Sequence, residues 1–179
     1  IPVGAGLGGG SADASYTLTG VNTLFDLGLS SAELEDFAAQ LGSDCAFFIE
    51  GGLQLAKGRG ELLSKIEPLG RTVHLVLCNP QIHVSTATAY AGVQPKNSRT
   101  ALLETFKTDG VNGLQNDFEA SVFESFPAIQ DLKNKLYAAG ATYAAMSGSG
   151  SSVFGIFDAA PVLSADLSSQ IIYSGPWCY

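Results

Sequence analysis

The stretch that decides the fold is Gly4-Ala5-Gly6-Leu7-Gly8-Gly9-Gly10-Ser11-Ala12-Asp13-Ala14-Ser15, in which five of twelve residues are glycine. Glycine lacks a Cβ atom, so its backbone adopts positive φ and approaches other groups closely. Apolar residues then recur at helical spacing and predict a helix over residues 11–27. These apolar residues are Leu18, Val21, Leu24, Phe25 and Leu27. Backbone N–H groups that lead into a helix N-terminus suit an anion, and a nucleotide phosphate is the simplest candidate.

Other interpretations of the glycine stretch fit the sequence less well. A flexible linker is disfavoured because linkers do not run directly into a patterned helix. A Walker A loop ends in Gly-Lys-Ser/Thr, whereas the first lysine of this chain is Lys57. A dinucleotide-binding loop could use Gly4, Gly6 and Gly9, but it requires a preceding strand, and only residues 1–3 precede it here.

Composition narrows the class of protein. With 46% hydrophobic and 15% charged residues, the sequence is typical of a globular protein. The net charge of −8 argues against a nucleic-acid partner, since phosphate backbones require a basic face. Cys45, Cys78 and Cys178 are odd in number and widely spaced, which favours reduced thiols. Neither a signal peptide nor a long apolar run is evident, so a cytoplasmic location is expected. Since the chain starts without Met, we expect a piece of a longer protein.

Downstream of residue 27 the pattern mixes helices and strands. Ser30 and Glu33 predict a capping box before a second helix, whose expected buried stripe is Leu34, Phe37, Ala38 and Leu41. Strands are predicted at residues 47–49, 53–57, 61–66, 72–79, 142–146, 152–157 and 170–174. Further helices are predicted at residues 99–108, 117–126, 128–139 and 161–169. The mixture predicts an α+β class, with a domain boundary near residues 68–72 that gives domains 1–70 and 71–179.

Asp44 is the first candidate for catalysis. It follows a helix stop at Gly42 and precedes an apolar run. A carboxylate at such a place could accept or orient the proton of an attacking hydroxyl, although turn aspartates more often serve structure. Ser11 could cap the first helix or reach a phosphate or Mg²⁺. Asp13 is interpreted equally well as a partner of the helix dipole.

Two further polar clusters could hold a substrate. The first is Asn79-Pro80 with Ser85 and Thr86, small polar groups after a predicted strand, where the nearby His83 is interpreted as a surface residue. The second is the segment 146–152, which could be a second phosphate-binding turn or a plain hairpin turn. The sequence contains no pattern typical of a serine hydrolase triad or a Cys-x-x-Cys metal site, and no metal-ligating residue is predicted.

Taken together, these motifs resemble those of the GHMP kinase superfamily. Its phosphate loop has the form Pro-x-x-x-Gly-Leu-Gly-Ser-Ser-Ala, which residues 2–11 approximate. Within the superfamily, three stretches are similar to kinases of the non-mevalonate isoprenoid pathway. They are the triple glycine with Ser11-Ala12-Asp13-Ala14, the octapeptide Leu41–Phe48, and Asn79–Thr86. The stretches 116–119 and 146–154 also fit, so the resemblance spans nearly the whole chain.

The resemblance implies a two-domain fold and a set of roles. Residues 1–70 would be the C-terminal part of an ATP-binding N-terminal domain, and residues 71–179 a ferredoxin-like C-terminal α/β sandwich. Asp44 would be catalytic, and the expected cofactors are ATP and Mg²⁺. The residues implied to bind ATP are Pro2, Gly4, Gly6, Leu7, Gly8, Gly9, Gly10 and Ser11. Those implied to contact substrate are Thr86, Gly148, Ser149 and Gly150.

The implied reaction is transfer of the ATP γ-phosphoryl group to a hydroxyl of a cytidine diphosphate-linked methylerythritol, a small-molecule partner. Homoserine- or mevalonate-type kinases and a non-catalytic nucleotide-binding module are the alternatives. No membrane partner is expected, and the oligomeric state is left open. Compared with the family pattern, the chain has Cys45-Ala46 where Val-Pro is usual, and an N-terminal segment that contributes to cytidine recognition is expected to be missing. The isolated chain is therefore expected to turn over little or no substrate.

Overall fold

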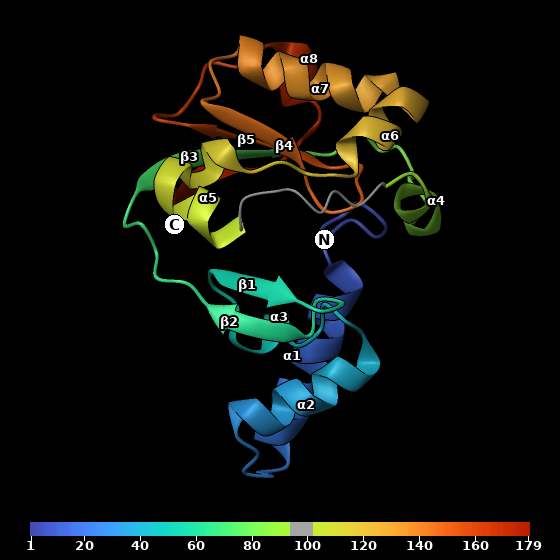
Figure 1. The fold of residues 1–179 in the computed structure, drawn as a ribbon, viewed down its shortest axis with the longest axis vertical. Helices are drawn as coiled ribbons and strands as arrows, with labels where there is room; N and C mark the ends of the chain where they lie inside the picture. The colour runs from blue at the N-terminus through green and yellow to red at the C-terminus, as the bar shows by residue number, and fades with distance from the viewer. Residues whose placement is uncertain (94–101) are drawn as a thin grey trace. The chain divides into compact units, whose positions relative to one another are not determined.

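The computed structural model describes residues 1–93 and 102–179, which form two compact units (Figure 1). One unit contains Ile1 and Gly8–Pro68, and the other contains Pro2–Leu7 and Leu69–Tyr179. Helices and antiparallel strands occur together, which confirms the α+β class. The predicted domains 1–70 and 71–179 stay a prediction, and the units differ from them because Pro2–Leu7 groups with the second unit.

The first unit begins with two helices. Helix α1 spans Gly9–Leu24, so it starts and ends earlier than predicted. Helix α2 spans Ser31–Leu41, and its predicted capping box is confirmed. The Ser30 side chain accepts from the Glu33 N–H at 3.4 Å, and the Ser30 N–H donates to Glu33 Oε2 at 2.8 Å. The Ser30 N–H and the Ser30 hydroxyl both donate to Glu33 Oε2, which favours the ionised carboxylate and lowers the pKa of Glu33.

The strand predicted at residues 47–49 is wrong, because this segment is a short helix, α3 (Phe47–Glu50). The backbone N–H groups of Phe48 and Ile49 donate to carbonyls three residues earlier, which closes a helical turn. Aromatic and β-branched residues favour strands only when a neighbouring strand can pair with them. The next two predicted strands are present as β1 (Gln54–Lys57) and β2 (Leu62–Lys65), which form an antiparallel pair.

The predicted apolar stripes of α1 and α2 are only partly buried. The core of this unit consists of Ala38, Cys45 and Ala46 with partly buried neighbours. In α2, Leu34 and Ala38 are buried as predicted, whereas Phe37 and Leu41 are exposed. The apolar end of the first predicted helix is exposed as well, namely Val21, Leu24, Phe25 and Leu27. The core of this unit therefore combines small buried residues with the partly buried Leu18, Ile49 and Leu63, whereas the exposed apolar residues named above lie outside it.

The second unit contains a sheet with strand order β4-β5-β3-β6, in which every pair is antiparallel. The strands are β3 (Thr72–Cys78), β4 (Tyr143–Met146), β5 (Val153–Phe157) and β6 (Ile171–Cys178). In Figure 1, α7 (Pro127–Ala138) and α8 (Ala165–Ser168) cover one face of this sheet. The apolar face of α7 is buried there through Ile129, Leu132 and Leu136. This packing of helices on an antiparallel sheet agrees with the predicted α/β sandwich.

Shorter helices complete the second unit. They are α4 (Thr86–Ala91), α5 (Leu102–Asp109), the 3-10 helix η1 (Gly110–Gly113) and α6 (Glu119–Ser125). The helix predicted at residues 99–108 corresponds to α5, although its first three residues lie outside the described residues. The final predicted strand is longer than expected, because β6 pairs with β3 along its whole length. None of the helices in the described part of the chain is long and apolar enough to cross a membrane.

Two buried groups of the second unit, the Cys78 thiol and the Tyr143 hydroxyl, are expected to make its stability depend on pH in alkali. Burial raises the pKa of Cys78 from 9.0 to about 11. Burial, together with the negative charge of Glu119, raises the pKa of Tyr143 from 10.0 to about 12. The unfolded chain therefore releases these protons at a lower pH than the folded chain does, so alkali favours unfolding. We expect the urea midpoint to fall as pH rises from about 9 to about 12, and to fall less in Tyr143→Phe than in the parent. An unchanged midpoint across this range would contradict the buried placement.

The three cysteine thiols are expected to react at different rates. Cys178 is exposed, whereas Cys45 and Cys78 are buried free thiols. Because the thiolate is the reactive form and requires access, iodoacetamide at pH 8 should alkylate Cys178 first. Peptide mass mapping before and after denaturation measures this order. In Cys178→Ser the rapid phase should be absent, and rapid labelling of Cys78 in the native protein would show that the sheet core is open.

Candidate active site

The first half of the glycine stretch lies against a turn of the second unit. Ser147 Oγ donates to the Gly6 carbonyl at 2.8 Å, and the Ser152 N–H donates to the Ala5 carbonyl at 3.0 Å. Gly4 and Gly6 have φ values of 67° and 74°. Two segments about 140 residues apart in sequence are therefore joined by one side-chain and one backbone–backbone hydrogen bond.

Gly6 is the position where the two segments come closest. A Cβ atom at this residue would overlap the Ser147 carbonyl oxygen and would lie 2.8 Å from the Gly150 carbonyl oxygen. From the other side, a Cβ atom at Gly148 would lie 3.1 Å from the Gly6 carbonyl oxygen. Backbone groups cannot move aside as the end of a side chain can, so glycine is required at Gly6.

The turn that receives the glycine segment connects β4 and β5. The Ser147 N–H donates to the Ser152 carbonyl, and the Gly150 N–H donates to the Ser147 carbonyl, both at 2.9 Å. Thr86, the first residue of α4, lies 3.4 Å from Ser149 through the two hydroxyl oxygens. The structure thus brings together the predicted residues of Pro2–Leu7, Gly148–Gly150 and Thr86. His83 is exposed as predicted, and its Nδ1 lies 3.4 Å from where a Cβ of Gly4 would stand.

The second half of the glycine stretch forms the start of α1 in the first unit. Gly8 is the N-cap residue, has φ 63°, and supplies no side-chain cap. Gly9, Gly10 and Ser11 are the first three residues of the helix. The interpretation of Ser11 as a capping residue is therefore wrong, because the helix begins before it. The N-terminal N–H groups of α1 receive no cap from a side chain, which suits an external anion.

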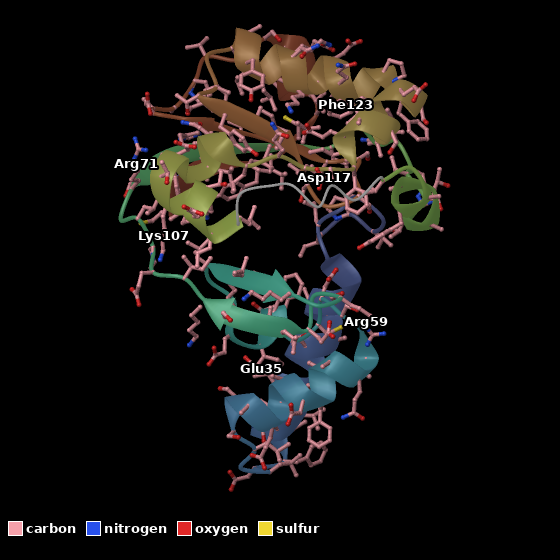
Figure 2. All side chains as sticks on the ribbon, viewed as in Figure 1. Glu35, Arg59, Arg71, Lys107, Asp117 and Phe123 are labelled. Atoms are coloured by element: carbon pink, nitrogen blue, oxygen red, sulfur yellow. The ribbon has the colours of Figure 1, made fainter. Side chains whose placement is uncertain are left out.

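Asp44 lies in the first unit on the turn between α2 and α3, and its side chain is exposed. The buried Ser15 hydroxyl on α1 donates to the Cys45 carbonyl at 2.6 Å, which attaches this turn to α1. Asp44 Oδ1 also lies 3.4 Å from where a Cβ of Gly60 would stand, in the β1–β2 turn that carries Arg59 (Figure 2). Within residues 1–93 and 102–179, the Asp44 carboxylate has no hydrogen-bond or ion-pair partner, so both oxygens remain available to a hydroxyl.

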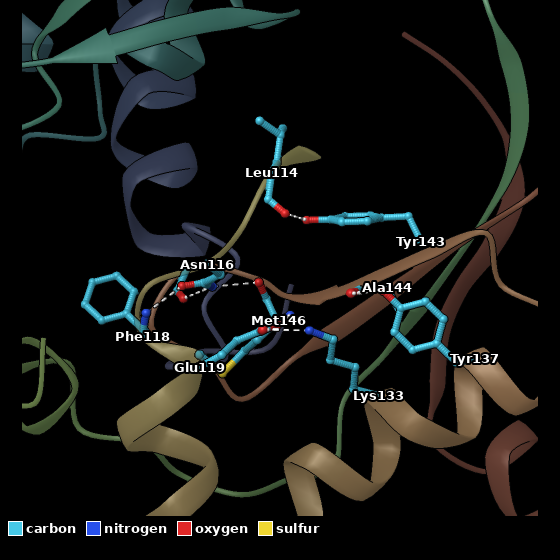
Figure 3. Close-up of polar contacts among 10 residues, drawn as sticks. Leu114, Asn116, Phe118, Glu119, Lys133, Tyr137, Tyr143, Ala144 and Met146 are labelled. Atoms are coloured by element: carbon cyan, nitrogen blue, oxygen red, sulfur yellow. Dashed lines mark hydrogen bonds and ion pairs between the residues drawn. The ribbon is translucent and has the colours of Figure 1, made fainter. Parts of the chain in front are cut away.

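A partly buried polar network lies behind the turn of the second unit, and no role was predicted for it from sequence. It joins Asn116, Glu119 and Lys133 to the backbone of Met146 and Gly148 (Figure 3). The sequence signal was present in the family-like stretch 116–119. Its contacts could not be deduced because they are made to backbone groups about 30 residues away.

The described residues do not form a dedicated metal cage. No group of three or more His, Cys, Asp or Glu side chains in residues 1–93 and 102–179 is placed to hold an ion. Mg²⁺ that arrives with a nucleotide is bound largely by phosphate oxygens and water, and it needs only one or two protein ligands. The Ser11 hydroxyl at the start of α1 fits that smaller requirement.

Comparison with known proteins establishes the family. Residues 1–52 match the model described as the GHMP kinases N terminal domain, and residues 100–170 match that of the GHMP kinases C terminal domain. The chain belongs to the GHMP kinase family. A solved 4-(cytidine 5'-diphospho)-2C-methyl-D-erythritol kinase matches with a TM-score of 0.77 and 29% identity, over 98% of this chain and 67% of that one. A homoserine kinase from Cytophaga hutchinsonii shares the fold, with a TM-score of 0.65 and 18% identity over 100% of this chain and 66% of that one.

Curated relatives with higher identity carry a particular enzyme name. The chain is 46% identical to 4-diphosphocytidyl-2-C-methyl-D-erythritol kinase of Cytophaga hutchinsonii, over 96% of this chain and 65% of the relative. It is 47% identical to the protein of the same name from Bacteroides fragilis strain YCH46, over 88% of this chain and 58% of the relative. The chain therefore spans about three fifths of the length of these relatives.

Proposed function

We propose that the protein containing this chain is a kinase that transfers the γ-phosphoryl group of ATP to the 2-hydroxyl of 4-diphosphocytidyl-2-C-methyl-D-erythritol. The observation that carries the proposal is the pair of hydrogen bonds that joins Pro2–Leu7 to the turn Ser147–Ser152. Two glycine-rich segments held together offer N–H groups to phosphate oxygens without intervening side chains. The sequence identity of 46–47% with relatives that carry this enzyme name supports the choice of substrate.

The residues of the glycine stretch are proposed to bind the ATP phosphates. Gly4, Gly6 and Leu7 would contribute backbone groups from the segment that begins at Pro2. Residues 8–11 would contribute the uncapped N-terminus of α1, whose dipole favours negative charge. Phosphoryl transfer depends mainly on positioning and on stabilising charge, so such a backbone site can supply much of what the reaction requires.

Asp44 is proposed to accept or orient the proton of the attacking hydroxyl. Its carboxylate is exposed, and the carbonyl of the next residue, Cys45, accepts from the Ser15 hydroxyl, which holds this turn on the helix whose N-terminus would face phosphate. Thr86, Gly148, Ser149 and Gly150 are proposed to contact the substrate. Mg²⁺, when bound with ATP, neutralises charge on the phosphates, and Ser11 is the candidate protein ligand. A cytoplasmic location stays a prediction.

The test is a turnover assay with the full-length protein that contains this chain. ATP consumption is measured with 4-diphosphocytidyl-2-C-methyl-D-erythritol, homoserine and mevalonate as separate acceptors. We expect turnover only with the cytidine compound. Preference for homoserine or mevalonate would assign another kinase activity of the family. Binding of ATP without turnover of any acceptor would favour a non-catalytic nucleotide-binding module.

A further inference from the structure

We infer that Asn116 and Glu119 are positioning residues that hold the backbone on both sides of Ser147 and thereby set the shape of the turn Ser147–Ser152. The inference rests on the proposed function, because it assumes that the glycine segment and this turn together form the site for the ATP phosphates and the substrate. Neither side chain is proposed to touch substrate. Asn116 acts through the carbonyls of Met146 and Gly148, and Glu119 acts through the Met146 N–H (Figure 3).

Asn116 uses both ends of its amide. Its Nδ2 donates to the carbonyls of Met146 and Gly148, each at 2.8 Å. Its Oδ1 accepts from the Phe118 N–H at 2.9 Å, which fixes the orientation of the amide. A single NH₂ group therefore bridges two carbonyls that flank Ser147. Aspartate has the same shape but offers only acceptor oxygens when ionised, so it cannot form this bridge.

Glu119 completes the hold on Met146. Its Oε1 accepts from the Met146 N–H at 2.8 Å, and its Oε2 pairs with Lys133 Nζ at 2.6 Å. Both charged side chains are largely buried, with 16% and 21% of their surface exposed. Lys133 pairs with the Glu119 carboxylate, so the negative charge of Glu119 is not left without a partner where it is largely buried.

The position of Met146 in the sheet explains why its backbone N–H and carbonyl need side chains as hydrogen-bond partners. Strand β4 lies at one edge of the sheet and pairs only with β5 among the described strands. The outward N–H and carbonyl of an edge residue find no neighbouring strand. Asn116 and Glu119 take the place of that strand at Met146. This satisfies the buried backbone and fixes the direction in which the chain enters the turn.

The hold on the turn reaches the glycine segment through Ser147. This residue lies between the two carbonyls bound by Asn116, and its hydroxyl donates to the Gly6 carbonyl. The Gly148 backbone packs directly against Gly6. A change in the amide at residue 116 should therefore reach Gly6 without any direct contact between the two residues.

The first test is Asn116→Asp in the full-length protein. The substitution places a carboxylate oxygen against two carbonyl oxygens while it keeps the size of the side chain. We expect the KM for ATP to rise at least about 10-fold and the KM for the alcohol substrate to rise with it, because the same turn carries residues proposed to contact the substrate. The matched control is Tyr143→Phe. Asn116 and Tyr143 line the same cavity of about 280 Å³, but the Tyr143 hydroxyl donates to the Leu114 carbonyl and not to the turn. The control should leave both KM values unchanged.

The second test separates the two functions of Glu119. Glu119→Gln keeps an oxygen that can accept from the Met146 N–H, whereas Glu119→Ala removes it. We expect the glutamine variant to retain a KM for ATP within about threefold of the parent and the alanine variant to exceed it by about 10-fold. Equal effects of the two variants would assign the role to the ion pair with Lys133 rather than to the backbone contact, and would overturn the inference for Glu119.

Hydrogen–deuterium exchange provides a readout independent of activity. In Asn116→Asp, amides of residues 147–152 should exchange faster, while the remaining amides of the second unit stay protected. Uniformly faster exchange with a matching loss of Tm, or an unchanged KM for ATP, would overturn the inference. If the parent protein does not turn over ATP, the proposed function fails. The exchange pattern still decides whether Asn116 holds the turn.

Discussion

Replacing Asp44 by asparagine is expected to lower kcat of the full-length protein by about 10²–10⁴-fold, the usual contribution of a positioned general base. The amide has the shape of the carboxylate but cannot accept the proton of a hydroxyl. Because Asp44 is exposed and contributes no hydrogen bond or ion pair within the described residues, the fold should not change. The KM for ATP and the Tm should therefore stay near those of the parent. Steady-state kinetics and a thermal melt measure these quantities.

A matched control distinguishes the role of this carboxylate from a general effect of charge. Asp36 is also an exposed aspartate of the first unit and lies on α2. Asp36→Asn removes the same charge at a position without a proposed role, so kcat should be retained. Full activity in Asp44→Asn would exclude Asp44 from the chemistry. Equal losses in both variants would indicate that net charge, rather than a positioned base, controls the rate.

The sequence predicted correctly those features of the fold that depend on contacts between residues close together in the chain. The Ser30–Glu33 capping box is one example, because both of its hydrogen bonds lie within four residues. The burial of α2 is different. Leu34 and Ala38 are buried but Phe37 and Leu41 are not, because burial depends on which elements lie against the helix. Periodicity identifies an apolar face, but it does not say how much of that face finds a partner.

The same distinction applies to the site. The glycine stretch was predicted from sequence to bind phosphate, and residues 146–152 were interpreted either as a second phosphate-binding turn or as a plain hairpin turn. Their contact through Gly6 and Ser147 is a fact of the tertiary structure. Sequence reasoning also treated the glycine stretch as one unit, whereas Pro2–Leu7 groups with one compact unit and Gly8 onward with the other. The role of Asn116 was missed because its partners are backbone carbonyls, which leave no trace in residue type.

The largest structural effect is expected for Gly6→Ala. The substitution forces an L-residue to adopt φ 74° and places a methyl group where the Ser147 carbonyl oxygen already lies. An unfavourable φ and an overpacked contact each cost about 1–3 kcal/mol, so we expect a comparable or larger loss of unfolding free energy. The KM for ATP should rise at least about 10-fold, since the glycine segment must move away from the turn. Urea denaturation and steady-state kinetics measure both effects.

Gly20→Ala is the matched control for that substitution. Gly20 lies inside α1, is exposed, and would have nothing within 4 Å of an added Cβ. Alanine in a helix interior stabilises by about 0.5–1 kcal/mol relative to glycine, so this variant should gain stability with an unchanged KM. Gly6→Ala and Gly20→Ala are the same chemical change, so their opposite effects on stability follow from the different surroundings of the two glycines. If Gly6→Ala were as stable and as active as the parent, the glycine segment would not rest on the turn in the working protein. The phosphate site would then have to be built from the N-terminus of α1 without the turn.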